Sequence, residues 1–544
     1  WGLHPVLTES VTNMVGRADL LAGFGVLAGL LCYLQFASGK RRGLWLAAFA
    51  GSVTVGLFSK ESVAVLVAVM LAYDLIFGAF RTREFWRARW AAYAAFGIVL
   101  LVFLALRANA LGHSVRPPFP YTDNPIAGAG FWIGRLTAFQ VIARYLGLLI
   151  WPLRLSADYS FNQIPLSTGG DWLAIVGLAA CLGLATVAVL SYGRQKIMCW
   201  AILFYLITLA PTANVFLAIG SIMAERFLYL PALSFVIAVV WVMNRIPSRP
   251  RWAVAAVLVA LAGARTYARN FDWADDRSLW TSAASATPDS YKVQLHLATV
   301  LAGASGGTLD QALPAVDRCL ALLAGLSDEQ NVPQAYAMAG FFYRSKGDAL
   351  ASNGSDGRQW YRKALEALLH GERIDRMQAE QIRRLNEANG IQTGPLGWHP
   401  LYLELGDAYL RLGQPEKSLK AFTYGRTLNP VPEFFEEMSR AYRDSGNEDK
   451  AEVTLWEGLL SNPSASQLGS ALASLYQRSD PTGCAVRTSG GALSFNPACP
   501  TVRIQACTAE ENMQQLYRQI GQPDNAGAIQ QRAQREFGCM PPAR

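Results

Sequence analysis

Apolar stretches long enough to cross a lipid bilayer recur through the first half of the chain and then stop. They fall near residues 18–37, 44–58, 62–79, 90–106, 131–151, 172–190, 197–217, 227–243 and 252–267. A helix needs about 20 apolar residues to span the hydrocarbon core, and a backbone inside lipid must pair its own polar groups, as a helix does. We therefore predict an all-α fold in two parts: a polytopic bundle of membrane helices at 1–268, and a polar helical domain at 269–544.

The charge content of the chain supports this division. Charged residues make up 16% of the chain, whereas a soluble protein has about 25%. The net charge of +8 comes in large part from arginines beside the apolar stretches, where positive residues anchor membrane helices. The positive charge therefore does not indicate nucleic-acid binding, and no nucleic-acid partner is expected.

Four short loops carry clusters of basic residues, and the positive-inside rule places all four in the cytoplasm. These clusters lie at 40–42, 81–89, 194–196 and 245–251. Two loops on one side of a membrane are separated by an even number of crossings, yet three apolar stretches lie between the second cluster and the third. The stretch at 131–151 is the weakest, because Arg135 and Arg144 give it an amphipathic pattern. We predict that it is an interfacial or re-entrant helix, which leaves eight spans.

The same topology places the remaining polar loop residues on the opposite, extracytoplasmic face. They are His4, Glu9, Arg17, Asp19, Lys60, Glu61, Asp123, Asp158, Glu225 and Arg226. Such a gathering is typical of a site that opens away from the cytoplasm. Structural explanations stay open beside it: a solvated turn at 60–61, a helix cap at 225–226, a turn before a proline at Asp123, a local ion pair at Asp158 and a structural role for His4.

Aromatic and small residues downstream of 289 recur with the spacing of tetratricopeptide (TPR) repeats. Tyr402 and Gly406 occupy two of the characteristic positions, and Tyr409 and Tyr442 stand 33 residues apart, close to the roughly 34-residue period of this repeat. We predict that 269–544 is a TPR α-solenoid with an insertion near 480–508. A solenoid has a concave groove suited to an extended peptide, so a protein or peptide partner is expected there.

Four of the eight cysteines crowd the C-terminal segment: Cys484, Cys499, Cys507 and Cys539. In an extracytoplasmic domain, four such cysteines indicate two disulfides, for which three connectivities exist. A zinc site is the alternative, but no CxxC spacing is present and the chain has only 5 His. No metal ligand is therefore assigned.

Several motifs along the chain resemble, in order, those of one family of membrane glycosyltransferases. They are HPVLTESVTNMVGRADLLA (4–22), LFSKES (57–62), TDNP (122–125), WPLRLSADYSFNQIP (151–165), AERFLYLP (224–231) and RTYARNFDWADDRSLWTSAASATPDSYKVQLHLA (265–298). Together they resemble the transmembrane and TPR repeat-containing O-mannosyltransferases of the GT-C class. The resemblance implies a GT-C-like membrane domain that moves a sugar, typically mannose, from a polyprenyl-phosphate carrier to Ser or Thr of an acceptor protein.

The resemblance also assigns roles to residues of this chain. Lys60 and Arg226 are expected to bind the phosphate of the lipid carrier, a dolichyl- or undecaprenyl-phosphate mannose or a similar donor, while Glu61 and Glu225 orient these cations. The catalytic carboxylates of a GT-C enzyme lie in its first external loop, so they are expected upstream of Trp1. Whether a divalent metal takes part stays open.

Two further functions fit the same pattern. One is a non-catalytic TPR scaffold anchored by the membrane helices, and the other is a different enzyme of lipid-linked glycans, such as an O-antigen ligase or polymerase. The ordered motifs favour the O-mannosyltransferase over the second of these. The Ala-, Arg- and Leu-rich composition favours a bacterial inner membrane, with the TPR domain in the periplasm.

Overall fold

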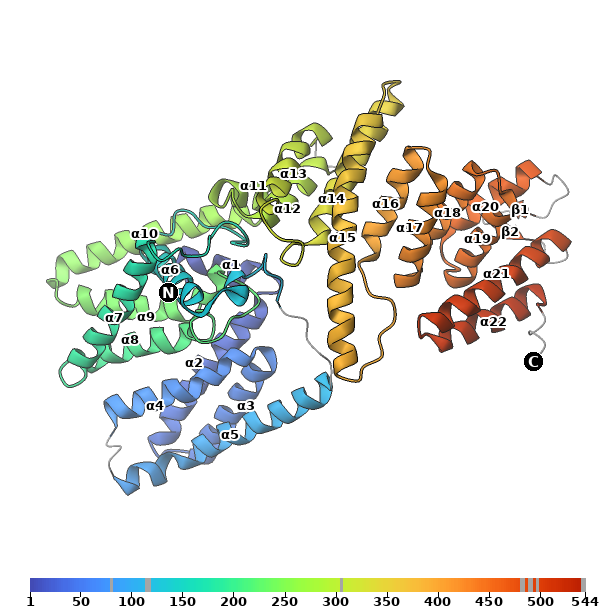
Figure 1. Ribbon diagram of the computed structural model, residues 1–544. Coiled ribbons are helices and arrows are strands. Elements are labelled where there is room, and N and C mark those ends of the chain that lie inside the picture. Colours follow the sequence, from blue (N-terminus) through green and yellow to red (C-terminus); the bar gives the residue numbers. More distant parts are fainter. Residues whose placement is uncertain are drawn as a thin grey trace. The chain divides into compact units, whose positions relative to one another are not determined.

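The computed structural model describes residues 1–78, 82–112, 119–303, 307–479, 485–487, 493–495 and 499–539. The chain divides into two compact units, Trp1–Gly303 and Ala304–Arg544, and almost every element is a helix (Figure 1). The predicted all-α architecture is therefore confirmed. The division differs from the one predicted at 268/269, because residues 269–303 belong to the first compact unit.

The first unit consists of long apolar helices joined by short 3₁₀ turns. Its elements are η1 (Pro5–Leu7), α1 (Thr8–Thr12), α2 (Arg17–Ala37), α3 (Arg42–Ser59), η2 (Glu61–Ala64), α4 (Val65–Phe77), α5 (Arg83–Leu111), η3 (Pro125–Gly128), α6 (Phe131–Ile150), α7 (Trp172–Ser191), α8 (Lys196–Leu209), η4 (Glu225–Leu228), α9 (Pro231–Met243), α10 (Ser248–Asp272), α11 (Asp276–Ala286) and α12 (Tyr291–Ala302).

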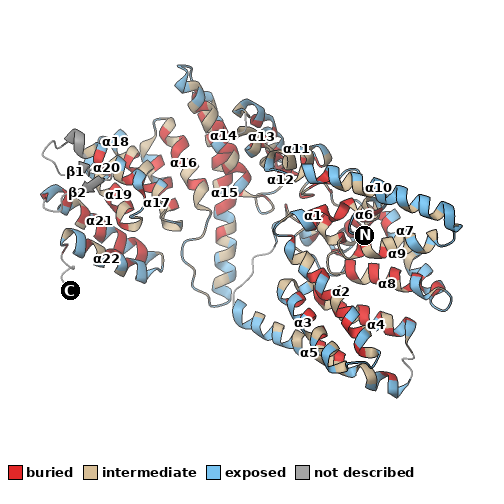
Figure 2. Ribbon diagram, turned by 180° about the vertical axis from the view of Figure 1, so that it is seen from behind, coloured by how far each residue is buried: buried red, intermediate tan, exposed pale blue. Residues whose placement is uncertain are grey.

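Five helices of the described residues are long and apolar enough to cross a membrane: α2, α3, α5, α6 and α7. Two shorter apolar helices are α8 and α9. Length and hydropathy thus qualify α6 as a spanning helix, so its interfacial placement and the total of eight spans stay predictions. Figure 2 shows exposed residues along α5 and α10, where large apolar side chains such as Leu101 and Trp252 lie on the surface. Lipid would cover such surfaces in a membrane protein.

Small residues let α2 and α3 pack closely. A Cβ built on Gly25 would lie 2.7 Å from the Cα of Gly56, so glycine at both positions allows the two backbones to approach. This contact places the loop after α3, which carries Lys60, beside the start of α2, which carries Asp19. The helix packing therefore sets the position of the first candidate cation.

The second unit continues the helix pairs. Its elements are α13 (Leu309–Leu323), α14 (Pro333–Ser352), α15 (Arg358–Ala388), α16 (His399–Arg411), α17 (Pro415–Leu428), α18 (Pro432–Asp444), α19 (Glu448–Ser461), α20 (Ser466–Ser479), β1 (Ala485–Arg487), β2 (Leu493–Phe495), α21 (Pro500–Gln519) and α22 (Pro523–Phe537).

The predicted TPR positions have the packing that the repeat requires. Tyr402 is fully buried, and a Cβ built on Gly406 would lie 2.2 Å from the Phe422 ring, so α16 and α17 touch through a glycine. The predicted insertion contains the antiparallel strands β1 and β2, in which Ala485 pairs with Phe495. They are the only strands among the described residues, and helical periodicity does not predict them.

The cysteines of the second unit form at least one disulfide, between Cys507 of α21 and Cys539 beyond the end of α22. Cys499 is also disulfide-bonded. Cys484 lies outside the described residues. The Cys507–Cys539 bond ties the last helix pair together, and so it extends beyond the insertion at 480–508.

Candidate functional site

A buried carboxylate holds Arg226 in place. Glu9 in α1 is 1% exposed, and its Oε2 accepts a hydrogen bond of 2.9 Å from the backbone N–H of Arg226 in η4. The Glu9 carboxylate also pairs with the Arg226 guanidinium. Burial raises the pKa of Glu9, and the guanidinium opposes that rise. Because a buried charge without its partner is strongly destabilising, Glu9 and Arg226 depend on each other.

A second cation lies close to Arg226. Lys60 follows α3, and its ammonium pairs with the Asp19 carboxylate in the first turn of α2. The Lys60 Nζ lies 5.6 Å from the centroid of the Phe227 ring, and the Arg226 Cζ lies 5.2 Å from the same centroid. The two side chains are 26% and 30% exposed. The structure thus brings two accessible cations to one aromatic ring, each held by its own carboxylate.

The two carboxylates that were predicted to orient these cations, Glu61 and Glu225, contact other residues instead. Glu61 is 66% exposed and pairs with Arg107 of α5 at 3.1 Å. The hydrogen bond from Arg107 lowers the pKa of Glu61. Glu225 points away from Arg226, since successive side chains of a 3₁₀ helix diverge by about 120°. The prediction for Glu61 and Glu225 is therefore corrected, because the orienting carboxylates are Asp19 and Glu9.

Glu225 lies in a buried polar network of its own. Its Oε1 accepts hydrogen bonds from the backbone N–H of Ser156 at 2.6 Å and from the Tyr159 hydroxyl at 2.7 Å. The Arg269 Nη2 lies 4.0 Å from Oε2, and both side chains are fully buried. Burial raises the pKa of Glu225 to about 8, although Arg269 lowers it. Burial therefore favours the protonated acid, and Arg269 favours the carboxylate.

Sequence reasoning did not single out Ser156, Tyr159 or Arg269. All three lie inside motifs that were recognised, at 151–165 and 265–298. The available signal was an arginine at 269 beyond the last apolar stretch, which needs a buried carboxylate when it is not exposed. Its nearer carboxylate is Asp272, three residues on, at 3.0 Å. Its approach to Glu225 could not be identified from sequence, because Glu225 is far away in the chain.

The loop that carries Ser156 and Tyr159 is bound to α11 and α12. The Ser156 and Thr287 hydroxyls are 2.6 Å apart. Two backbone hydrogen bonds of 2.7 Å join the same segments, from Asn162 N–H to the Asp289 carbonyl and from Tyr291 N–H to the Phe161 carbonyl. The first helix pair of the predicted repeat domain thus completes the surroundings of Glu225.

Asp158 strengthens this contact between the loop and α12. Its Oδ2 accepts hydrogen bonds from the backbone N–H of Ser160 and the Ser290 hydroxyl, both at 2.8 Å, and from the Ser160 hydroxyl at 2.5 Å. Nearby, the Asp123 carboxylate pairs with Lys292 of α12 at 2.7 Å. Asp158 and Asp123 are therefore anchors for the first helix pair.

The two remaining candidates, His4 and Arg17, make no hydrogen bond or ion pair with Lys60 or Arg226 among the described residues. The His4 Nδ1 accepts a hydrogen bond from the Val6 N–H and its Nε2 lies 3.0 Å from the Leu149 carbonyl, and burial lowers the pKa of His4. This geometry agrees with a structural role. Arg17 is exposed at the start of α2 and has no side-chain partner within the described ranges. In the same ranges, no group of three or more His, Cys, Asp or Glu residues could hold a metal ion.

Comparison with known proteins matches both units of the chain. Residues 113–184 match the family model "Protein O-mannosyl-transferase TMTC, DUF1736", and residues 399–423, within α16 and α17, match the tetratricopeptide repeat model. The chain is similar to the TMTC protein O-mannosyl-transferases. The resemblance predicted from the motifs is thereby confirmed. Together with the five apolar helices, this similarity identifies a membrane protein that carries TPR repeats.

Three similar curated proteins come from animals. Protein O-mannosyl-transferase Tmtc3 of Drosophila melanogaster is 27% identical over 52% of this chain and 36% of its own length. TMTC3 of Homo sapiens is 25% identical over 54% of this chain and 35% of its own length. TMTC4 of Mus musculus is 27% identical over 56% of this chain and 46% of its own length. The chain thus spans less than half the length of these relatives.

A solved TPR protein of Thermus thermophilus is 20% identical to this chain. The match covers 41% of this chain and 96% of the solved one, with a TM-score of 0.28.

Proposed function

We propose that this chain belongs to a membrane glycosyltransferase that moves mannose from a polyprenyl-phosphate carrier to Ser or Thr residues of an acceptor protein. The similarity to protein O-mannosyl-transferases supports the reaction. The observation that carries the proposal is the pair of accessible cations, Lys60 and Arg226, beside the Phe227 ring. The site lies on the extracytoplasmic face in this proposal, and a bacterial inner membrane is the proposed location.

The two cations suit a lipid phosphate. In the transfer, the bond between the sugar C1 and the phosphate oxygen breaks, the acceptor hydroxyl oxygen bonds to C1, and the hydroxyl proton passes to a general base. The electron pair of the broken bond stays on the phosphate, which gains charge as the sugar leaves. Arg226 offers a planar fork of donors to phosphate oxygens and Lys60 offers a point charge. Donors held in place before the charge develops lower the barrier.

Glu9 and Asp19 hold these donors in place. Glu9 contacts both the backbone and the side chain of Arg226, so the guanidinium cannot rotate freely. Asp19 fixes the Lys60 ammonium at the start of α2. Each cation thus remains partly exposed for a phosphate while its orientation is set by protein contacts. Glu225 supports η4 from the other side through Ser156 and Tyr159.

The TPR repeats supply protein binding in this proposal. The concave side of a solenoid is suited to an extended polypeptide, and a transferase that modifies Ser or Thr needs its acceptor in an accessible conformation. The second unit would therefore hold the acceptor or a partner protein, while the lipid carrier binds at the first unit.

The test measures transfer of labelled mannose from polyprenyl-phosphate mannose to a Ser/Thr-containing acceptor by the protein in membranes. Lys60→Met and Arg226→Lys are expected to lower kcat by about 100-fold, the usual effect of removing or displacing one charge-stabilising donor. Arg107→Met is the matched control, since Arg107 pairs with the exposed Glu61 and its ring contact is with Phe103. Equal activity of all three variants would refute the proposal.

A further inference from the structure

The chain segments on either side of α6 meet on one face of the first unit. After α6, the Phe161 N–H donates a hydrogen bond of 2.9 Å to the carbonyl of Thr122, which precedes α6. Both segments also contact α12. Asp123, before α6, pairs with Lys292 at 2.7 Å, and the Phe161 carbonyl accepts a hydrogen bond of 2.7 Å from the Tyr291 N–H. A helix that crossed the bilayer would place these two segments on opposite faces.

The loop that follows α6 also returns along the helix. α6 has 20 residues and is about 30 Å long, enough to cross the hydrocarbon core. The Thr137 hydroxyl, in the second turn, accepts a hydrogen bond of 2.9 Å from the Ser167 N–H. In the last turn, the Leu149 carbonyl lies 3.0 Å from His4 Nε2. A loop that leaves the end of α6 and contacts its second turn does not continue on the far side of a membrane.

The neighbouring apolar helices show which face this is. Val141 of α6 lies in one apolar cluster with Leu209, the last residue of α8, and Ala232, in the first turn of α9. The basic clusters at 194–196 and 245–251 flank the other ends of these two helices. Because basic loops remain in the cytoplasm, α6 packs against the extracytoplasmic ends of α8 and α9.

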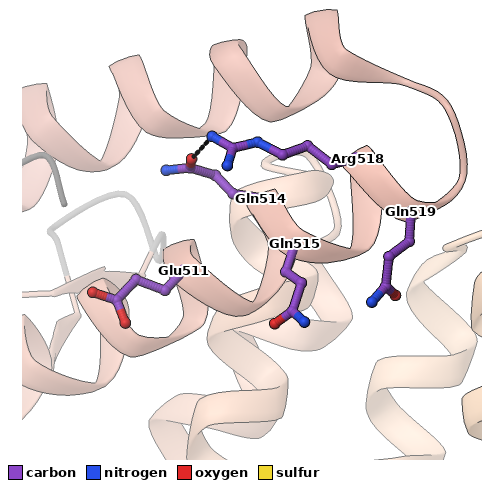
Figure 3. A pocket seen from close by; sticks show the side chains of 5 residues that line it. All are labelled: Glu511, Gln514, Gln515, Arg518 and Gln519. Carbon is purple, nitrogen blue, oxygen red and sulfur yellow. Dashed lines mark hydrogen bonds between the residues drawn. The ribbon is translucent and has the colours of Figure 1, made fainter. Parts of the chain in front are cut away.

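The exposed side chains of α6 are all apolar. They are Phe131, Trp132, Ile133 and Ile150, and Trp151 follows directly. By contrast, the exposed side chains at 511–519 on α21 of the second unit are all polar. Figure 3 shows four of them: Glu511, Gln515, Arg518 and Gln519. Tryptophan at the end of an apolar helix is typical of the membrane interface, so the exposed ends of α6 match a lipid surface.

α6 also holds the segment that carries Arg226. The hydroxyl of Tyr145, which is fully buried in α6, accepts a hydrogen bond of 3.1 Å from the Ala224 N–H, directly before η4. Leu228, at the end of η4, lies in the same apolar cluster as α6. The depth of α6 in the membrane therefore determines the depth of Arg226.

We propose that α6 lies in the interface of the extracytoplasmic leaflet without crossing the bilayer, with Trp132 and Trp151 in the lipid, and that it holds Arg226 at the membrane surface. This placement gives an even number of crossings between the basic clusters at 81–89 and 194–196, because α5 and α7 cross and α6 does not. If the proposed function holds, the phosphate of the lipid carrier lies at that surface, where Arg226 meets it.

The first test measures on which side of the membrane each end of α6 lies. Gly43, Gly130 and Gly170 are exposed and leave open space for a Cβ. Each is replaced by cysteine in the full chain, and a membrane-impermeant maleimide is added to intact and to permeabilised bacterial spheroplasts, with the unsubstituted chain as background. Gly130→Cys and Gly170→Cys, on either side of α6, should be labelled in intact spheroplasts. Gly43→Cys, beside the basic cluster at 40–42, should be labelled only after permeabilisation.

Two outcomes of this labelling would overturn the proposal. If Gly130→Cys is labelled in intact spheroplasts and Gly170→Cys only after permeabilisation, or the reverse, then α6 crosses the bilayer. If both are labelled only after permeabilisation, then α6 does not lie at the extracytoplasmic leaflet.

The second test identifies what covers the exposed ends of α6. Trp132→Cys and Trp151→Cys chains carry the fluorophore NBD in liposomes of phosphatidylcholine and phosphatidylglycerol, and Gln531→Cys, on an exposed position of α22, is the control. An interfacial helix lies about 5–10 Å deep, so a nitroxide near the lipid headgroup should quench positions 132 and 151 more strongly than one at the end of the acyl chain. Position 531 should not be quenched. Absence of quenching at 132 and 151 would indicate a protein partner and overturn the proposal.

The third test concerns the depth of Arg226. The Trp132→Ser, Trp151→Ser double variant is expected to lower transfer from a long-chain polyprenyl donor about tenfold, as the loss of buried apolar area predicts. Transfer from a short-chain, water-soluble donor should be unchanged, because that donor is not held at a fixed depth. An equal effect on both donors would overturn the depth-setting role. A wild-type chain that uses neither donor would overturn only the proposed function, since labelling and quenching do not depend on transfer.

Discussion

Lys60 and Arg226 come from distant parts of the chain and share the Phe227 ring, at 5.6 and 5.2 Å from its centroid. Each cation has a separate counter-ion, Asp19 for Lys60 and Glu9 for Arg226. The pairs differ in burial, because Glu9 is 1% exposed and Asp19 lies closer to the surface. This difference determines what the removal of each carboxylate should do.

Glu9→Gln is expected to lower the free energy of unfolding by about 2 kcal/mol. Loss of one partner of a fully buried ion pair costs about 3–5 kcal/mol, and the partial exposure of Arg226 reduces that figure. Asp19→Asn should cost less than about 1 kcal/mol, as for a pair near the surface. Thermal unfolding of the two purified variants in detergent measures the difference. A larger effect for Asp19→Asn would contradict the assignment of burial.

Glu225 should make stability fall as pH rises. Its pKa is about 8 in the folded protein, against 4.5 for an ordinary glutamate, so the folded state holds a proton that the unfolded state has released above pH 4.5. The stabilisation is fully present below pH 4.5 and is lost as pH rises toward 8. Midpoints of thermal unfolding between pH 5 and 9 should show this decline in the wild type and a smaller one in Glu225→Gln.

The contribution of Glu61 to stability should depend on pH in the opposite direction to that of Glu225. Arg107 lowers the pKa of Glu61, so its contribution is present above the unfolded pKa and is lost as pH falls through the folded pKa. Glu61→Gln should therefore leave the decline above pH 5 unchanged. A wild-type profile that Glu225→Gln does not alter would contradict the buried acid at Glu225.

Asp158 should control the docking of the first helix pair. Asp158→Ala removes the acceptor of three hydrogen bonds, including the one from Ser290, and leaves buried donors unpaired. Amide hydrogen exchange is expected to quicken about tenfold or more at 158–163 and 289–292. Ser285→Ala on the exposed face of α11 is the control, since its hydroxyl bonds only within its own helix. Unchanged exchange in Asp158→Ala would contradict the anchoring role.

The Cys507–Cys539 disulfide should stabilise the last helix pair. It closes a loop of 32 residues, which corresponds to about 3–4 kcal/mol in a chain-entropy treatment. The Cys507→Ser, Cys539→Ser double variant is expected to expose the segment after α22 to protease at a lower temperature than the wild type. Each single variant leaves one of the two cysteines without its partner, and non-reducing gels show whether that cysteine forms a different disulfide. Equal protease resistance with and without the bond would contradict this contribution.

Local periodicity accounts for the parts of the fold that were predicted well. The apolar stretches correspond to helices because a backbone in lipid must pair its own polar groups, as a helix does. The TPR spacing located Tyr402 and Gly406 correctly at a tight helix contact. The strands β1 and β2 were not predicted, since two runs of three residues carry too little pattern. The unit boundary was placed too early, because a change in hydropathy does not show that α11 and α12 dock on the membrane unit.

The sequence by itself determined the helical architecture, the TPR repeats and the set of polar residues from which a site could be built. Only the tertiary structure decided how those residues pair. Neighbours such as Glu225 and Arg226 face different surroundings because a 3₁₀ helix turns about 120° per residue. Glu9 meets Arg226, and Glu225 meets Tyr159 and Ser156, through contacts between distant segments. Such pairings depend on how helices cross, and no spacing along the chain encodes that.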